Sequence, residues 1–129
     1  MPSVLLVDDD VELLRQMAAV FSAGGFEVLT AGDGQAALTT LSTAQADLVV
    51  TDIIMPVREG VETIMALKAK APDRPVIAIS GGYRVGPGEF LKLARHLGAD
   101  DVLAKPFRPS ELLAAANRLL TRTAKAEVA

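Results

Sequence analysis

A small set of acidic, hydroxyl and basic side chains in this sequence could carry out chemistry together. The acids are the run Asp8-Asp9-Asp10 and the isolated Asp52, the hydroxyl belongs to Ser80, and the amine belongs to Lys105. Carboxylate oxygens bind hard cations, and a carboxylate can also act as a nucleophile. A lysine and a hydroxyl can bind the oxygens of a phosphoryl group. If the fold gathers these residues, their types indicate cation-assisted phosphoryl transfer.

Each of these residues stands just beyond a short apolar segment. Wholly apolar segments of this length that contain β-branched residues are typical of strands buried on both faces. Such strands are predicted at Val4–Val7, Leu48–Val50, Val76–Ile79 and Val102–Ala104, and a further strand is predicted at Phe26–Thr30. The candidate residues therefore belong to the ends of strands, where side chains from several strands can meet.

Between the predicted strands, apolar residues recur at the spacing of amphipathic helices. Asp9 or Asp10 can cap the first helix, and Gly24-Gly25 can end it. Pro109 suits the first position of the last helix. The apolar face of the first helix is predicted to consist of Val11, Leu14, Met17, Ala18 and Phe21.

Alternating strands and helices predict a single α/β domain. The expected architecture is a flavodoxin-like (βα)5 fold, a doubly wound sheet of five parallel strands in the order 2-1-3-4-5 with helices on both faces. In this order, ligands bind beyond the carboxyl ends of the first and third strands. This places Asp8 and Asp9 beside Asp52. Ser80 and Lys105 follow the next two strands at the same edge.

Such a cluster of carboxylates requires a cation. Two carboxylates about 4 Å apart repel each other by ~4 kcal/mol at an effective dielectric of roughly 20. A site made of oxygen ligands, in a chain with a single histidine, suits Mg²⁺, which keeps several of its waters. A metal beside a carboxylate favours phosphoryl chemistry. Asp52 is then the predicted nucleophile, with Lys105 and Ser80 on the phosphoryl oxygens.

The composition argues against several other classes of function. The 129 residues include 13 basic and 16 acidic side chains without a basic stripe, so direct nucleic-acid binding is not expected. The absence of cysteine excludes disulfides and thiolate catalysis. The run Val4–Val7 is too short for a signal peptide or a membrane span, which predicts a soluble, cytoplasmic protein. We expect one domain over residues 1–122, a flexible tail over 123–129 and no attached output domain.

Short motifs follow the predicted strands in a recognisable order. They are Val7-Asp8-Asp9, Thr51-Asp52-Ile53-Ile54-Met55-Pro56, Ile79-Ser80-Gly81 and Lys105-Pro106-Phe107. Each motif is weak alone, but their combination is specific. From about Ser3 to Leu120 the chain resembles the receiver domain of a two-component response regulator, of the stand-alone, chemotaxis-regulator type. The resemblance implies a phosphoacceptor rather than a turnover enzyme.

The resemblance also implies a role for each residue of the acidic cluster. Asp52 would be phosphorylated from a phosphohistidine on a partner histidine kinase or phosphotransfer protein. Asp9 and Asp52 would ligate Mg²⁺ directly, and the backbone carbonyl of Ile54 would be a third protein ligand. Asp8 would act through a water molecule.

Further expectations concern the phosphoryl group and the signal. Lys105 and Ser80 would bind phosphoryl oxygens, and the Lys105–Pro106 bond is expected to be cis, the isomer of only ~5–6% of X–Pro bonds in folded proteins. Phosphorylation would switch the surface near the fourth helix, the fifth strand and the fifth helix. A separate downstream protein would read this surface. The chain is expected to be a monomer or a weak homodimer, without a nucleic-acid or membrane partner.

The sequence departs from the usual receiver pattern in three ways. Ser80 replaces the commoner threonine but keeps a hydroxyl. Val102 stands where many receivers have a tyrosine or phenylalanine that swings inward on activation. Ser80 and Lys105 are also further apart than usual, and the extra residues are assigned to the glycine-rich segment 81–88. We hypothesise that this loop is mobile and that Tyr83 replaces the missing aromatic switch.

Two other functions are compatible with parts of the sequence. Val7-Asp8-Asp9-Asp10-Val11 and Ile79-Ser80 resemble two motifs of haloacid-dehalogenase-like phosphatases. However, Asp100-Asp101 precede Lys105, which reverses the order of that family, and the chain lacks room for the usual cap. The other alternative is a receiver-like binding module that is never phosphorylated. Simple scaffolding, however, gives no reason for clustered acids.

Overall fold

The computed structural model describes residues 1–52, 57–80, 92, 95–96 and 98–128, and for residues 57–61, 80 and 123–128 it describes the backbone alone. Strands and helices alternate along most of this chain. The described elements are β1 (Ser3–Val7), α1 (Val11–Ala23), β2 (Glu27–Ala31), α2 (Gly34–Thr43), β3 (Leu48–Asp52), α3 (Val57–Lys70), β4 (Val76–Ser80), β5 (Asp101–Ala104) and α5 (Pro109–Val128).

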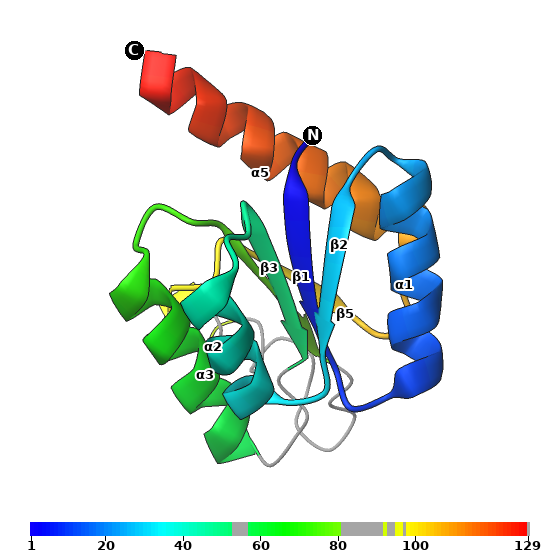
Figure 1. The fold of residues 1–129 in the computed structure, drawn as a ribbon, viewed down its shortest axis with the longest axis vertical. Coiled ribbons are helices and arrows are strands. Elements are labelled where there is room, and N and C mark those ends of the chain that lie inside the picture. Colours follow the sequence, from blue (N-terminus) through cyan, green and yellow to red (C-terminus); the bar gives the residue numbers. More distant parts are fainter. Residues whose placement is uncertain (53–56, 81–91, 93–94, 97, 129) are drawn as a thin grey trace.

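The five strands form one parallel sheet in the order β2-β1-β3-β4-β5 (Figure 1). Helices α1 and α5 pack together on one face of the sheet, and α2 and α3 pack together on the other. The flavodoxin-like α/β fold, the strand order and the single domain predicted from the sequence are therefore confirmed. The sequence also predicts a fourth helix over about residues 90–97, which Gly98 would close. Within that range, Lys92, Arg95 and His96 are helical and exposed, and the other residues lie outside the described part of the chain.

Alternate residues of the inner strands face opposite layers. Val4 and Leu6 of β1 belong to a core that includes residues of α1 and α5. Leu5 and Val7 belong to a second core that includes residues of α2 and α3. All four side chains are fully buried. Because both faces are covered, β1 is apolar at every one of these positions and lacks the alternating pattern of a half-exposed strand.

Helix α1 begins and ends at the residues that the sequence indicated. The Asp10 side chain accepts hydrogen bonds from the backbone N–H groups of Glu12 and Leu13, so Asp10 is the cap. At the other end, Gly24 is the C-cap and Gly25 has φ +91°, a left-handed conformation that favours glycine.

One residue of the predicted apolar face of α1 does not face the core. Met17 and Phe21 are buried, and the Phe21 ring meets Phe26 edge-to-face with centroids 4.9 Å apart. Val11, however, is 67% exposed. The spacing of apolar residues shows which side of a helix faces the core. It does not show how much of the helix length packs against the sheet. The prediction for Val11 was therefore wrong.

Strand β5 and helix α5 complete the fold at one edge of the sheet. Of the four residues of β5, only Val102 is buried. The Lys105–Pro106 peptide bond that follows is cis, as predicted. Helix α5 continues to Val128 and projects beyond the sheet (Figure 1). The helical backbone thus includes most of segment 123–129, whose flexibility stays a prediction. No helix in the described part of the chain has both the length and the hydropathy to cross a membrane.

Candidate functional site

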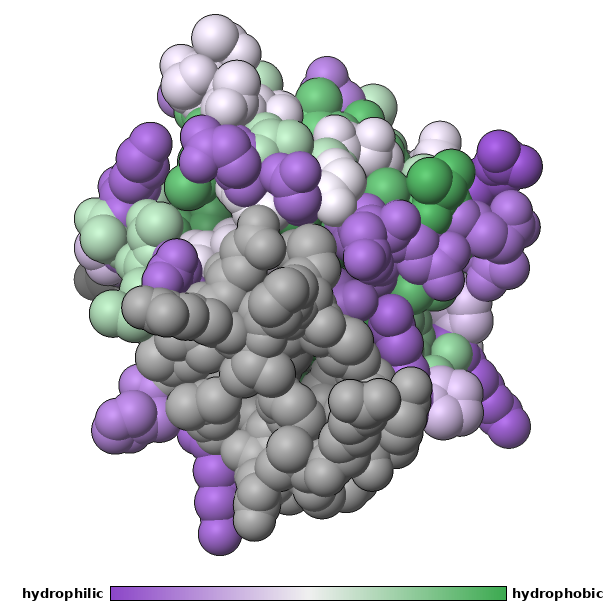
Figure 2. Space-filling view, turned by 90° about the horizontal axis from the view of Figure 1, so that it is seen from below, coloured by the Kyte–Doolittle hydropathy of each residue, from purple (hydrophilic) through white to green (hydrophobic). Residues whose placement is uncertain are grey.

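The predicted site residues lie at one edge of the sheet, where parallel strands end. Asp8 follows β1 directly, Asp52 is the last residue of β3, and Ser80 is the last residue of β4. Lys105 follows β5. The strand register places these ends side by side, because Val7 is paired with Thr51, Asp52 with Ile79, and Ser80 with Ala104. Figure 2 views the molecule from this end, and strongly hydrophilic residues gather on the side where α1 lies.

Three carboxylates converge at this edge. Asp8, Asp9 and Asp52 each offer an oxygen, and these oxygens all lie within 4.8 Å of one another. Asp8 is fully buried, Asp52 is 2% exposed, and Asp9 is exposed. Asp8 and Asp52 therefore lie in the protein interior, and Asp9 lies on the solvent-exposed side of the cluster. The sequence correctly predicted that the three acids meet.

Asp8 is held by a backbone contact that the sequence did not suggest. Its Oδ1 accepts a hydrogen bond from the backbone N–H of Asp10 at 2.8 Å. Because Asp10 also caps α1, the start of that helix and the orientation of the Asp8 carboxylate are fixed by the same turn. The only sequence signal for this contact was the run of consecutive aspartates.

Lys105 places its ammonium between the two buried acids. The Nζ atom is 3.2 Å from Asp52 Oδ2 and 3.5 Å from Asp8 Oδ2. The Lys105 side chain is 27% exposed, so solvent can still reach it. The structure therefore brings Lys105 together with the acids as predicted. We name Asp8, Asp9, Asp52 and Lys105 the carboxyl-edge cluster.

The electrostatics of the cluster reflect its burial and its excess of acids. Burial raises the pKa of Asp8 to about 6, the hydrogen bond from Asp10 opposes the rise, and the charge of Asp52 adds to it. Burial alone would lower the pKa of Lys105, but the charges of Asp52 and Asp8 outweigh it and raise that pKa. Lys105 consequently stays charged near neutral pH, and its single ammonium lies among three carboxyl groups.

The donor set fits a small hard cation. The three acids present only oxygen atoms, at a mutual spacing that one ion could bridge. One ammonium does not balance three carboxylates. Ile54, the predicted backbone ligand, lies outside the described residues, as do Tyr83 and segment 81–88. The Ser80 backbone is at the expected place, and its side chain lies outside the described part.

Comparison with known proteins places this geometry in a family. The sequence model described as "Response regulator receiver domain" matches residues 4–117. The chain belongs to the response-regulator receiver domains. Members of this family are phosphoacceptor switches of two-component signalling rather than turnover enzymes.

Solved receiver structures resemble this receiver domain over nearly its full length. The receiver domain of the Francisella response regulator 1452 is 32% identical, with a TM-score of 0.85 over 95% of this chain and 99% of the other. A CheY-like receiver domain protein from Methanospirillum hungatei is 25% identical, with a TM-score of 0.88 over 98% of each chain.

Curated relatives are longer than this chain. The transcriptional regulatory protein PrrA of Mycobacterium tuberculosis is 40% identical over 121 residues, which are 94% of this chain and 51% of PrrA. The transcriptional regulatory protein CpxR of Escherichia coli is 37% identical over 123 residues, which are 95% of this chain and 51% of CpxR. The chain thus spans about half the length of the curated relatives it matches.

Proposed function

We propose that this receiver domain accepts a phosphoryl group on Asp52, with Mg²⁺ bound beside it, from a partner histidine kinase or phosphotransfer protein. The observation that carries the proposal is the carboxyl-edge cluster. A nearly buried carboxylate has an ammonium at 3.2 Å and two further carboxylates within reach of a shared cation.

The transfer is a displacement at phosphorus. A carboxylate oxygen of Asp52 forms a bond to phosphorus while the bond from phosphorus to the donor histidine nitrogen breaks. The electron pair of the broken bond stays on that nitrogen, and the ring, protonated at its other nitrogen, leaves as neutral histidine. Attack of water on the phosphorus of the acyl phosphate later restores the carboxylate and releases inorganic phosphate.

The other cluster residues bind and orient the transferred group. Asp9 and Asp52 are the proposed direct ligands of the cation together with the Ile54 carbonyl, and Asp8 acts through water. When bound, Mg²⁺ supplies positive charge beside the phosphoryl oxygens and relieves the repulsion among the acids. Lys105 binds one phosphoryl oxygen with its ammonium, which already lies next to the nucleophile.

Ser80 is proposed to donate its hydroxyl to another phosphoryl oxygen. Its position at the end of β4, paired with Ala104 of the neighbouring strand, supports this role because Lys105 follows Ala104 directly. The signal is proposed to leave through the surface near the fourth helix, β5 and α5 and to reach a separate protein target. A cytoplasmic location, the lack of direct nucleic-acid contact, and a monomer or weak homodimer stay predictions for this chain.

Phosphoryl uptake by the purified protein tests the proposal. The protein is incubated with a small acyl-phosphate donor and Mg²⁺, and its intact mass is followed over time. We expect a gain of one phosphoryl group that decays, and no gain in Asp52→Asn. Asp73→Asn, which changes an exposed acid outside the site, is the matched control and should behave like the wild type.

Each alternative function predicts a different result, in the mass assay or in a turnover assay. No gain of mass in the wild type would refute the proposal and leave a binding module. Continuous turnover of a generic phosphate ester, independent of Asp52, would instead support a phosphatase.

A further inference from the structure

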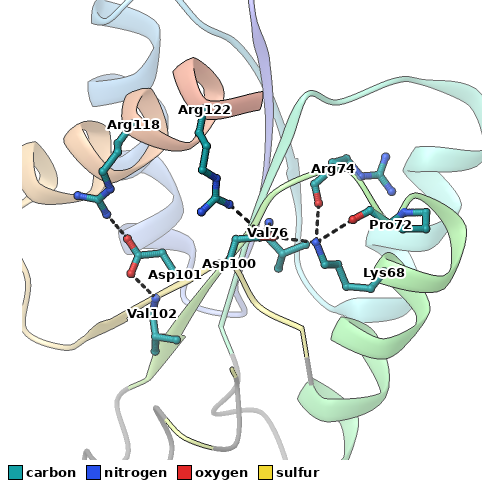
Figure 3. A network of polar contacts seen from close by, with 9 residues as sticks. All are labelled: Lys68, Pro72, Arg74, Val76, Asp100, Asp101, Val102, Arg118 and Arg122. Atoms are coloured by element: carbon teal, nitrogen blue, oxygen red, sulfur yellow. Dashed lines mark hydrogen bonds and ion pairs between the residues drawn. The ribbon is translucent and has the colours of Figure 1, made fainter. Parts of the chain in front are cut away.

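A second group of charged residues lies at the opposite edge of the sheet, where β4 and β5 begin. It contains two acids that precede or start β5 and basic side chains from α3 and α5 (Figure 3). We name it the amino-edge network. Its members are Lys68, Asp100, Asp101, Arg118 and Arg122. The proposed phosphoryl transfer uses none of them.

Lys68 links the C-terminal end of α3 to this network by hydrogen bonds. Its Nζ donates to Asp100 Oδ2 at 2.8 Å, to the Arg74 carbonyl at 3.1 Å and to the Pro72 carbonyl at 3.2 Å (Figure 3). An ammonium has three donors, and all three are engaged. The side chain is also only 19% exposed. The end of α3 therefore cannot shift without displacing Asp100 or breaking these bonds.

Asp100 joins α3 to the sheet and to α5. Its Oδ2 also accepts from the backbone N–H of Val76 at 2.9 Å, and its own N–H donates to the Val76 carbonyl at 2.8 Å. Its other oxygen, Oδ1, accepts from Arg122 of α5 at 3.4 Å. One carboxylate thus touches α3, the start of β4 and α5.

Helix α3 connects the region of Asp52 with the amino-edge network. The helix begins at Val57, shortly after Asp52, and ends at Lys70 beside the network. A helix in a packed layer moves as a nearly rigid body, so a displacement at its first turn reaches its last turn.

We propose that Lys68, Asp100 and Arg122 form a relay that carries the effect of phosphorylation from α3 to the end of α5. The inference rests on the proposed phosphorylation of Asp52. The phosphoryl group displaces the start of α3, Lys68 moves Asp100 with it, and the bond to Arg122 changes the docking of α5 around residues 117–122. Arg122 is the adjustable end of the relay, because its side chain is 64% exposed and its contact is the longest.

Amide hydrogen exchange of α5 with and without phosphorylation tests the relay. In the wild type, a small acyl-phosphate donor and Mg²⁺ should change exchange in residues 117–122 by at least about twofold. In Arg122→Gln this change should disappear while phosphoryl uptake, followed by mass in the same samples, is unaffected. Lys68→Met should also lose the response of α5 but keep a response in α3.

A matched control separates the relay from a general effect of surface charge. Arg15→Gln removes an exposed arginine that pairs with Glu12 on α1, and it should respond like the wild type. An α5 response in Arg122→Gln equal to that of the wild type, or no α5 response in a phosphorylated wild type, would overturn the relay but not the proposed function. A wild type that takes up no phosphoryl group would overturn both.

Discussion

A group of charged residues lies at each end of β5, and the two groups differ in charge and in burial. In the carboxyl-edge cluster, one lysine faces three carboxylates, of which two are nearly inaccessible to solvent. In the amino-edge network, two carboxylates face three basic side chains and accept backbone N–H groups as well. Among the described residues, acids outnumber bases by two in the first group, whereas bases outnumber acids by one in the second. A buried cluster with an excess of acids is suited to bind a cation, whereas a network in which each carboxylate has basic and backbone N–H partners holds elements together.

The largest difference between the two edges should appear when each lysine is removed. We expect Lys105→Met to slow phosphoryl uptake by about 100-fold, because a positioned charge beside the transferred group is lost. The measurement is the rate of mass gain with a small acyl-phosphate donor and Mg²⁺. Lys70→Met, which changes an exposed lysine of α3, is the control. Similar rates in Lys105→Met and the control would remove Lys105 from the mechanism.

The pH dependence of stability should also distinguish the carboxyl edge. The folded-state pKa of Asp8, about 6, exceeds its ordinary value of 3.8. Between these values the folded state binds more protons than the unfolded state, so the free energy of unfolding falls as pH rises. In metal-free protein, the raised pKa of Asp8 should lower the free energy of unfolding by ~3 kcal/mol over this pH range. Lys105, whose pKa is raised above 10.5, stays charged throughout this interval.

Urea denaturation in the presence of a metal chelator, at several pH values between about 4 and 7, measures this effect. In Asp8→Asn, the free energy of unfolding should not show the fall with rising pH that Asp8 causes. This variant should therefore be more stable than the wild type at the upper end of the pH range. If the stability of the two proteins depended on pH in the same way, burial would not raise the pKa of Asp8. Addition of Mg²⁺ should restore stability to the wild type more than to the variant.

Removal of the lysine at the amino edge should affect stability rather than chemistry. Lys68→Met removes one of the donors to the partly buried Asp100 carboxylate and the Lys68 hydrogen bonds to the carbonyls of Pro72 and Arg74. We expect it to lower the free energy of unfolding by ~1–3 kcal/mol and to leave phosphoryl uptake within about twofold of the wild type. Thermal denaturation and the mass assay check the two parts. A large loss of uptake with intact folding would contradict the separation of the two edges.

The smallest effect is expected at the exposed end of the network. Arg122→Gln should change the free energy of unfolding by no more than ~1 kcal/mol, because solvent and salt screen an exposed ion pair. Urea denaturation at low and high salt measures it, and the difference from the wild type should shrink as salt is added. A larger loss that persists at high salt would show that α5 depends on this contact for its folding.

Much of the carboxyl edge could be predicted from the sequence because its signals are local. A continuous apolar run such as Val4–Val7 indicates a buried strand, and Asp8 and Asp52 lie directly at strand ends. The topology of a parallel sheet then brings those ends together without further information. The cis bond after Lys105 followed from the resemblance alone.

The amino-edge network could not be predicted in this way. Lys68 and Asp100 are separated by 32 positions, and no pattern in the sequence connects the two. Their meeting depends on the length of α3 and on the left-handed turn at Gly98, which has φ +105°. Val11 shows a related limit, because periodicity does not report how far along a helix the sheet extends. Pairwise contacts of this kind follow only from three-dimensional packing.

The most direct test of the account is to locate the phosphoryl group within the chain. The wild-type protein is treated with a small acyl-phosphate donor, once with Mg²⁺ and once with a chelator, and its peptides are mapped by mass spectrometry. The account predicts modification of the peptide that contains Asp52, and only in the sample with Mg²⁺. Modification at another residue, or equal modification in the chelated sample, would contradict it.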